Sequence, residues 1–271
     1  MLKTIPAFCQ LIKSGKGLSD KVIIFRYFIF CSISSLLPRT IRNKIKVFDF
    51  ITKDITISTK HGEYSCRAKT DDLLICGKED YEDKLNGLFD VVNGGVFIDV
   101  GAHIGRYTVQ VARKEGVRVI SIEPQSQNFQ MLQKNISLNN LKDVISLNCA
   151  VYKIPKVLKF YISNHPGLHS IYQKTNKCIT VKSDTLNNIV KRFKLERVDL
   201  VKIDVEDAEL DVLKGSDEVL LKFKPKIIFE CRSLPAIMKI RKYLVGFDYN
   251  ISEVMEHNYV ANHKKEYELV A

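Results

Sequence analysis

From residue 95 onward, hydrophobic positions along the chain follow two alternating rhythms. Short apolar runs are separated by stretches in which apolar residues recur every three or four positions, the spacing of one helix face. Strands that alternate with helices are typical of a mostly parallel sheet covered on both faces. We therefore predict an α/β fold, with strands at 96–100, 117–122, 144–149, 198–203 and 226–231 and two closing antiparallel strands at 247–254 and 266–271.

Before residue 95, in residues 47–69, apolar residues recur at every second position. Apolar residues alternate with polar ones at 47–51, 55–59 and 64–69, which predicts two or three short antiparallel strands, with a turn at His61 and Gly62. These patterns divide the chain into three parts: a basic and apolar helical appendage at 1–46, short strands and a lead-in at 47–92, and the main α/β domain at 93–271.

The most apolar stretch of the chain, residues 22–37, lies in the N-terminal appendage. It is shorter than the ~20 residues that span a bilayer, and Arg26 interrupts it. A secretory signal is disfavoured because Pro38 and Arg39 stand where a small-residue cleavage site is expected. Two interpretations stay open: a helix that packs on the strands that follow, or a basic helix in a membrane interface.

Charge is distributed unevenly along the chain. The formal net charge is +11, which would suit an acidic partner such as nucleic acid or an anionic membrane. Residues 1–48, however, hold nine basic residues and one acid, Asp20, so this segment alone carries +8. The rest of the chain is almost balanced and contains no Trp, so a nucleic-acid partner is not favoured.

The seven cysteines are odd in number, widely spaced and without a CxxC pair. This usage predicts buried thiols in a reducing compartment, and therefore a cytoplasmic protein. Because the six histidines do not lie near a cysteine ligand pattern, we predict no structural zinc site. A metal held by Asp204, Glu206 and Glu230 is an alternative that oxygen ligands alone indicate only weakly.

The strongest local motif is FIDVGAHIGRYTVQVA at 97–112. A strand delivers Asp99 near its carboxyl end, Gly101 permits a tight turn, and Gly105 permits close packing of the next helix. The spacing Gly-x-x-x-Gly differs from the GxGxxG of dinucleotide-binding enzymes, and the segment lacks the Gly-Lys-Ser/Thr of a phosphate-binding loop. Alone, this motif indicates only a strand-to-helix turn that a ligand can approach.

A second motif makes that turn more informative. The strand at 117–122 is followed by Glu123, and a carboxylate at this position can accept hydrogen bonds from both hydroxyls of a ribose. A glycine turn and a ribose acid without phosphate ligands suit an adenosine cofactor that lacks phosphates. S-adenosylmethionine is such a cofactor.

With these motifs in this order, the chain resembles the FkbM family of S-adenosylmethionine-dependent methyltransferases. The resemblance covers about residues 60–231 and rests on FIDVGAHIGRYTV, SIEPQSQNF, NCAVY, GLHSI, SDTL, VDLVKIDVEDAELDVLKG and KPKIIFE. It implies a Rossmann-like class I fold: a mostly parallel seven-stranded sheet with helices on both faces, here preceded by an N-terminal helical segment and short antiparallel strands. One departure is Asp207, where the family usually has Gly.

The resemblance also implies roles for single residues. The methionine part of the cofactor would be lined by Asp99, Gly101, Ala102, His103 and Gly105. Glu123 would hold the ribose, and Asn148 and Ala150 would lie by the adenine. For His103, a turn residue whose backbone matters more than its imidazole is the simpler interpretation. The implied acceptor is a hydroxyl group of a sugar, a glycolipid or a natural product.

Acidic residues follow the strand at 198–203, at the edge where open α/β sheets bind ligands. An alcohol has a pKa far above neutral, so its methylation is helped by a His or carboxylate base. The candidate catalytic residues are Asp204, Glu206, Glu209 and His169. Glu209 has an alternative role, because acids are also favoured in the first turn of a helix.

Two other classes of protein stay open at this point. An RNA or DNA methyltransferase would share the cofactor half, and a non-catalytic adenosine-binding protein would share the fold. Intact Asp99, Glu123 and Asp204 favour catalysis. We expect a cytoplasmic enzyme, and residues 1–46 raise the alternative of a peripheral contact with the inner face of the membrane.

Overall fold

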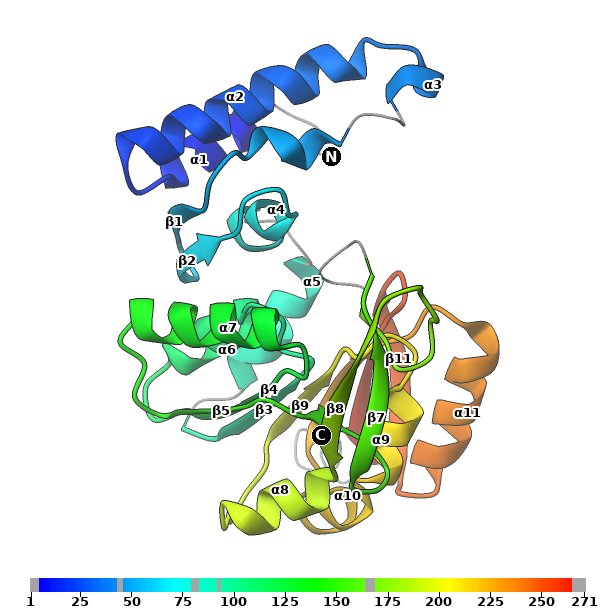
Figure 1. Cartoon of the computed structure of the whole chain (residues 1–271). Helices are drawn as coiled ribbons and strands as arrows, with labels where there is room; N and C mark the ends of the chain where they lie inside the picture. Colours follow the sequence, from blue (N-terminus) through cyan, green and yellow to red (C-terminus); the bar gives the residue numbers. More distant parts are fainter. Residues whose placement is uncertain (1–4, 43–45, 79–82, 92–93, 164–168, 265–271) are drawn as a thin grey trace. The chain divides into compact units, whose positions relative to one another are not determined.

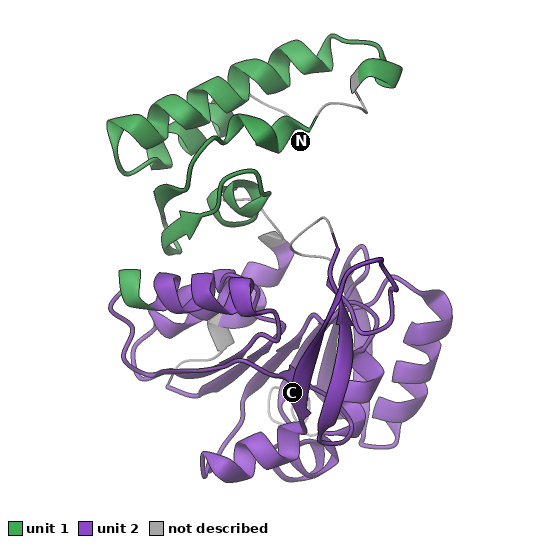
Figure 2. Ribbon diagram, viewed as in Figure 1, with its two compact units in different colours: residues 1–83, 137–139 green, residues 84–136, 140–271 purple. Residues whose placement is uncertain are grey.

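The computed structural model describes residues 5–42, 46–78, 83–91, 94–163 and 169–264. The chain forms two compact units: unit 1 comprises residues 1–83 and 137–139, and unit 2 comprises residues 84–136 and 140–271 (Figure 2). The division predicted from the sequence, at 46/47 and 92/93, stays a prediction. Within the described ranges, no helix has the length and apolar character needed to cross a membrane.

A seven-stranded sheet forms the centre of unit 2, in the order β11-β12-β10-β9-β3-β4-β5 (Figure 1). Its parallel strands are β3 (Val96–Val100), β4 (Arg118–Ile122), β5 (Val144–Leu147), β9 (Leu200–Ile203) and β10 (Lys226–Glu230). The antiparallel strands β12 (Asn258–His263) and β11 (Tyr249–Met255) close it beyond β10. The predicted Rossmann-like α/β fold with a mostly parallel sheet is confirmed.

The order of the strands creates a switch point between β3 and β9. From β3 the chain continues to β4 and β5 on one side, and β9 and β10 lie on the other side. The two strands pair in parallel, with Val100 opposite Ile203. Ligands of open α/β sheets bind where the strand order reverses in this way, outside the carboxyl ends of the strands. Residues that follow β3 and β9 therefore share one crevice edge.

Side chains that alternate along the central strands give the sheet two apolar faces, as expected when helices cover both sides. Phe97 packs on one face, with residues of α5 (Asp83–Asn86), η2 (Gly87–Val91) and α6 (Arg106–Ala112). Ile98 packs on the other, with residues of α8 (Leu186–Arg192), α9 (Glu209–Lys214), α10 (Asp217–Phe223) and α11 (Leu234–Val245). A smaller sheet of β6 (Ala150–Val151), β8 (Cys178–Asp184) and β7 (Lys156–Tyr161) has its own apolar cluster.

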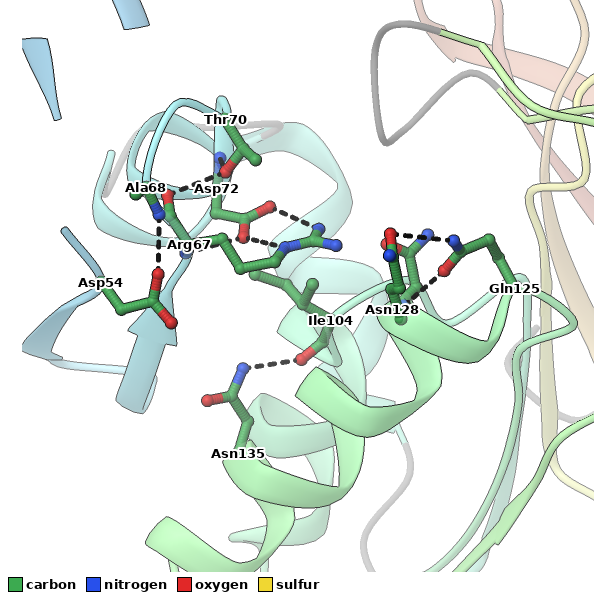
Figure 3. Close-up of polar contacts among 10 residues, drawn as sticks. Asp54, Arg67, Ala68, Thr70, Asp72, Ile104, Gln125, Asn128 and Asn135 are labelled. Carbon is green, nitrogen blue, oxygen red and sulfur yellow. Dashed lines mark hydrogen bonds and ion pairs between the residues drawn. The ribbon is translucent and has the colours of Figure 1, made fainter. Parts of the chain in front are cut away.

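Unit 1 consists of α1 (Ile5–Ser14), α2 (Leu18–Ser35), α3 (Arg39–Arg42), η1 (Val47–Phe50), the hairpin of β1 (Ile55–Thr59) and β2 (Gly62–Cys66), and α4 (Asp72–Gly77). The ring of Tyr27 in α2 stacks on Phe48, and that of Phe30 stacks on Phe50. Behind the hairpin, Arg67 Nε contacts the fully buried Asp72 Oδ2 at 2.7 Å (Figure 3). These contacts hold α2 and α4 against the short strands.

Three expectations for the short strands and the tail need correction. Residues 47–50 form a 3₁₀-helix instead of a strand, because their aromatic rings pack against α2 and not in a sheet. The expected final strand at 266–271 lies outside the described residues. The strand that pairs with β10 at the closing edge is β12, at 258–263. The strand over 247–254 is confirmed by β11. The predicted turn lies one residue earlier, at Lys60 and His61, because Gly62 already pairs with Thr59 in the hairpin.

Candidate functional site

The turn after β3 needs glycine at its first position. Gly101 has φ +83°, and a Cβ there would overlap the carbonyl oxygen of Asp204. The N–H groups of Gly101 and Ala102 both donate to the carbonyl of Ile122, at 2.9 and 3.1 Å. Only glycine combines this backbone conformation with such a close approach. The turn thus brings the chain after β3 into direct contact with the chain after β9.

Gly105 joins this turn to the two helices beside it. Its φ is +91°, and a Cβ there would lie 2.6 Å from the Leu132 Cδ1 of α7 (Ser126–Leu138). On the same helix, Asn135 Nδ2 donates to the Ile104 carbonyl at 2.8 Å (Figure 3). Hydrogen bonds to β4 and contacts with α7 therefore hold the glycine turn in place.

Asp99 is a buried carboxylate, and only one of its two oxygens has a hydrogen-bond partner among the described residues. Its Oδ2 accepts a hydrogen bond from Thr108 Oγ1 at 2.7 Å, whereas its Oδ1 is buried and has no hydrogen-bond partner among the described residues. Burial raises the pKa of Asp99, although the nearby ammonium of Lys202 lowers it in part. A buried acceptor without a partner is costly, so this oxygen is suited to a donor brought by a ligand.

Glu123 directly follows β4, as the sequence predicts, and hydrogen bonds fix its carboxylate. Its Oε2 accepts from the His103 N–H and its Oε1 from the Gln125 N–H, both at 2.9 Å. Burial raises the pKa of Glu123 to about 7, although these hydrogen bonds lower it in part. The Asn128 side chain is a third donor to this carboxylate, which has about four acceptor positions, so some acceptor capacity remains for a hydroxyl group.

The remaining residues expected at the cofactor lie on the same side of the sheet. His103 has φ +52°, and its backbone N–H donates to Glu123. This hydrogen bond fits the simpler interpretation, in which the backbone of His103 matters more than its imidazole. Asn148 Nδ2 donates to the carbonyls of Glu123 and Pro124, at 2.8 and 3.1 Å. Ala150 is buried at the start of β6. Asn148 therefore shapes the loop that carries Glu123.

Sequence reasoning did not single out Gln125 and Asn128. Gln125 Oε1 accepts from the Asn128 N–H at 2.6 Å and so binds the first turn of α7 (Figure 3). This hydrogen bond stabilises the loop that places Glu123.

A small, open cavity lies at the ends of β9 and β10. Its lining residues are mainly charged: Asp204, Glu206, Asp207, Glu209, Glu230, Cys231 and Arg232. Three of the four predicted catalytic residues, Asp204, Glu206 and Glu209, are thus brought together. Because Asp204 also touches the glycine turn, the cavity adjoins the residues expected at the cofactor.

Two cations contact three of these five carboxylates. Lys202 Nζ contacts Asp204 Oδ2 at 2.8 Å, and Arg232 contacts Glu206 at 3.2 Å and Glu230 at 2.6 Å. Arg232 is a residue that sequence reasoning missed, and its place directly after the strand run at 226–231 was the available signal. Paired charges of this kind keep buried acids oriented.

Burial raises the pKa values of the acids in this cavity. The pKa of Glu206 rises to about 7, with a further contribution from the charge of Asp204. The pKa of Glu209 rises to about 8, again mainly through burial. The pKa of Glu230 also rises, through burial and then Asp204. Perturbed acids that face a cleft are characteristic of functional sites.

The unusual Asp207 occupies a backbone conformation that favours glycine, with φ +79°. Its carboxylate accepts a hydrogen bond from Gln173 Nε2 at 2.8 Å, which links it to the loop after β7. Aspartate tolerates this region better than most residues. The structure thus gives a reason for the family's glycine and shows how this chain holds an acid there.

The fourth catalytic candidate, His169, lies in the loop beside the cavity. It is not among the residues that line the cavity. Its Nδ1 accepts a hydrogen bond from the Ser163 N–H at 3.0 Å, and its ring packs edge-on against Phe160. The next residue, Ser170, donates to the Glu206 carbonyl at 2.5 Å. In this structure His169 therefore supports the loop beside the cavity.

Fold and site together define a Rossmann-like enzyme domain whose glycine turn adjoins an acidic cavity. Comparison with known proteins places this domain: residues 99–256 match the model of the methyltransferase FkbM domain. Since the match covers more than half of the chain, the chain belongs to the FkbM methyltransferase family, whose members depend on S-adenosylmethionine.

Two curated relatives agree with this assignment. Methyltransferase sdnD of Sordaria araneosa is 27% identical over 175 residues, 52% of this chain and 68% of that protein. Methyltransferase 1 of Beauveria bassiana (strain ARSEF 2860) is 29% identical over 165 residues, 52% of this chain and 66% of that protein. The crystal structure of methyltransferase FkbM from Methylobacillus flagellatus KT aligns with a TM-score of 0.46 and 14% identity, over 95% of this chain and 58% of that one. The chain thus spans about two thirds of the curated relatives.

Proposed function

We propose that the protein transfers a methyl group from S-adenosylmethionine to a hydroxyl oxygen of a small acceptor: a sugar, a glycolipid or a natural product. The observation that carries this proposal is the contact between the two halves of the site. The turn at Gly101 lies against the Asp204 carbonyl, and Lys202 lies between Asp99 and Asp204. Residues suited to a cofactor and residues suited to an acceptor therefore adjoin.

The residues around the glycine turn fit the cofactor. The unpaired Oδ1 of Asp99 is suited to an ammonium group such as that of the methionine part. The spare acceptor positions of Glu123 are suited to ribose hydroxyls. Ala102, His103, Gly105, Asn148 and Ala150 would complete the binding surface. When bound, S-adenosylmethionine supplies a methyl group already activated on a sulfonium, so the protein has mainly to align the acceptor and accept its proton.

Asp204 and Glu206 are the residues that we assign to the acceptor. Asp204 lines the cavity beside the glycine turn, and Lys202 fixes its orientation. Glu206 has a pKa of about 7, close to the value at which a general base is most effective near neutral pH. Glu209, with a pKa of about 8, would hold its proton at pH 7 and donate a hydrogen bond instead.

Calorimetry tests the cofactor, and a pH profile tests the base. S-adenosylmethionine should bind to the full chain and NAD should not; the reverse result would refute the proposal. A screen of sugars and lipid-linked glycans with methyl-labelled cofactor then identifies an acceptor. With that acceptor, kcat should rise with pH through an apparent pKa near 7, because Glu206 must lose its proton, and Glu206→Gln should abolish this limb. An unchanged limb in Glu206→Gln would remove Glu206 from the role of base.

A further inference from the structure

Helix α2 (Leu18–Ser35) carries apolar residues on two opposite sides. One side is buried in unit 1 through Ile23, Ile24, Tyr27 and Cys31. The opposite side, here called the exposed stripe, is formed by Leu18, Val22, Phe25, Ile29, Ile33 and Leu36, which are 41–85% exposed. Spacings of three and four residues place all six on one helix face. The packing interpretation of residues 22–37 therefore describes only half of this helix.

Charged residues of α2 are sorted in relation to the exposed stripe. At 3.6 residues per turn, the exposed Lys21 and Arg26 lie about 60–80° to either side of its centre. Asp20, the sole acid between residues 18 and 36, is on the opposite side, where its carboxylate accepts from the Thr56 N–H of β1 at 3.4 Å. The surface presented by α2 is thus apolar along its centre, basic at both borders and without an acid.

We propose that the exposed stripe binds a membrane surface rich in anionic lipids, with α2 lying in the plane of the interface. Apolar side chains on one helix face insert at the boundary between headgroups and acyl chains. Lys and Arg at the borders of such a face extend their charged ends toward the lipid phosphates. Both features are present on one face of α2.

The distribution of charge favours lipid over a second copy of the chain. Two copies that met through this face would bring their Lys21 and Arg26 borders together, and the face has no acid to pair with them. An anionic bilayer supplies that negative charge and an apolar layer at the same time. Exposed Arg39 in α3, just beyond the helix, adds to the same positive field.

Vesicle co-sedimentation tests this proposal with the full chain and without any measurement of activity. The chain should bind vesicles of phosphatidylcholine with about one third phosphatidylglycerol at low salt, and bind phosphatidylcholine alone at least about 10-fold less. Salt of ~0.5 M should weaken the binding, because it shortens the screening length. Lys21→Ser combined with Arg26→Ser should lower the partition coefficient about 30-fold, since each cation contributes a factor of about 5.

The apolar contribution is tested by Val22→Ser, Phe25→Ser and Ile29→Ser together, which should lower binding about 100-fold. Because these side chains are exposed, the melting temperature should stay within a few degrees of wild type. The matched control is Leu221→Ser with Met238→Ser, two residues of unit 2 that are 63% and 64% exposed, and it should bind like wild type.

Three results would overturn the proposal. The first is wild-type protein that does not bind anionic vesicles at low salt. The second is a stripe variant that binds as well as wild type. The third is a wild-type dimer that does not bind vesicles, together with a monomeric stripe variant. A second copy of the chain, and not a membrane, would then cover the exposed stripe.

Discussion

The two groups of carboxylates at the crevice differ in how the fold holds them. Asp99 and Glu123 belong to the ends of β3 and β4, are almost fully buried, and are fixed mainly by hydroxyl and backbone N–H donors. Asp204 and Glu206 follow β9, line an open cavity, and are fixed by the cations Lys202 and Arg232. The first pair has acceptor positions left for a ligand, whereas the second pair has charges that respond to protons and acceptors.

The difference shows how one residue type can serve two purposes. Neutral donors orient a carboxylate without cancelling its charge, which suits the recognition of an ammonium or hydroxyl group. A neighbouring cation stabilises the ionised form, while burial and neighbouring acids oppose it, so the pKa can lie near neutral. We therefore expect substitutions of the first pair to change binding and substitutions of the second pair to change turnover.

The largest expected effect comes from the turn that joins the two groups. Gly101→Ala would place a Cβ on the Asp204 carbonyl oxygen and add a side chain at φ +83°. We expect a loss of at least about 3 kcal/mol in the free energy of unfolding, or failure to fold. Urea denaturation measures this. Gly87→Ala is the matched control, because a Cβ there meets no atom within 4 Å; an equal loss in both variants would contradict the role of the turn.

Asp204→Asn should separate turnover from folding. The side chain keeps its size but loses the charge that contacts Lys202 and that helps to raise the pKa of Glu206 to about 7, so the Glu206 base loses this tuning. We expect kcat to fall about 100-fold or more, with a melting temperature within a few degrees of wild type. Kinetics and thermal denaturation of the same preparation test this. A variant that does not fold would show instead that Asp204 is structural.

Glu123→Ala should weaken cofactor binding more than it lowers kcat at saturating cofactor. It removes the carboxylate expected at the ribose and leaves the His103 and Gln125 N–H groups without their acceptor. The cost is about 1–3 kcal/mol, a factor of about 5–150 in Kd by calorimetry. Together with Asp204→Asn, this variant tests whether one pair of acids serves cofactor binding and the other serves turnover. Unchanged cofactor affinity in Glu123→Ala would contradict that assignment.

The smallest expected effect is a change in how stability depends on pH. Burial raises the pKa of Glu209 to about 8 from its ordinary value of 4.5, so the folded state retains a proton that the unfolded chain has lost. This contribution to stability is present below about pH 4.5 and is lost as pH rises to about 8. Wild type should therefore melt at a higher temperature at pH 5.5 than at pH 8, and Glu209→Gln should reduce that difference. The pKa values of Glu123 and Glu206 are also raised, each to about 7, so these two acids act in the same direction. Part of the difference in melting temperature should therefore remain in Glu209→Gln.

Much of the cofactor half of the site could be predicted because its signals are local. A buried strand, a glycine turn and an acid after the next strand lie within 97–123, and the backbone explains each of them. The acceptor half could be predicted only in outline. Asp204, Glu206 and Glu209 follow one strand, but Arg232 follows the next strand, and its contact with Glu206 depends on how β9 and β10 pair.

Errors in the predicted elements have the same origin. The alternating residues at 47–51 satisfy a strand pattern, yet rings of α2 are the nearest apolar surface, and stacking on them favours a 3₁₀-turn. The closing strand β12 contains the polar Asn258 and His263, which are buried between neighbouring strands. These polar residues hid the strand from the hydrophobic pattern, although β12 lies between β10 and β11 in the sheet.

The sequence by itself determined the α/β class, the order of the central strands' motifs and the FkbM resemblance, because periodicity and glycine turns act over a few residues. The tertiary structure alone decided that Arg232 meets Glu206, since this ion pair joins residues distant in the chain. It brought Arg232 into the cavity and raised the pKa of Glu206 and Glu209 through burial. It also divided the apolar residues of α2 between a packed side and an exposed one, because only packing determines which face a helix buries.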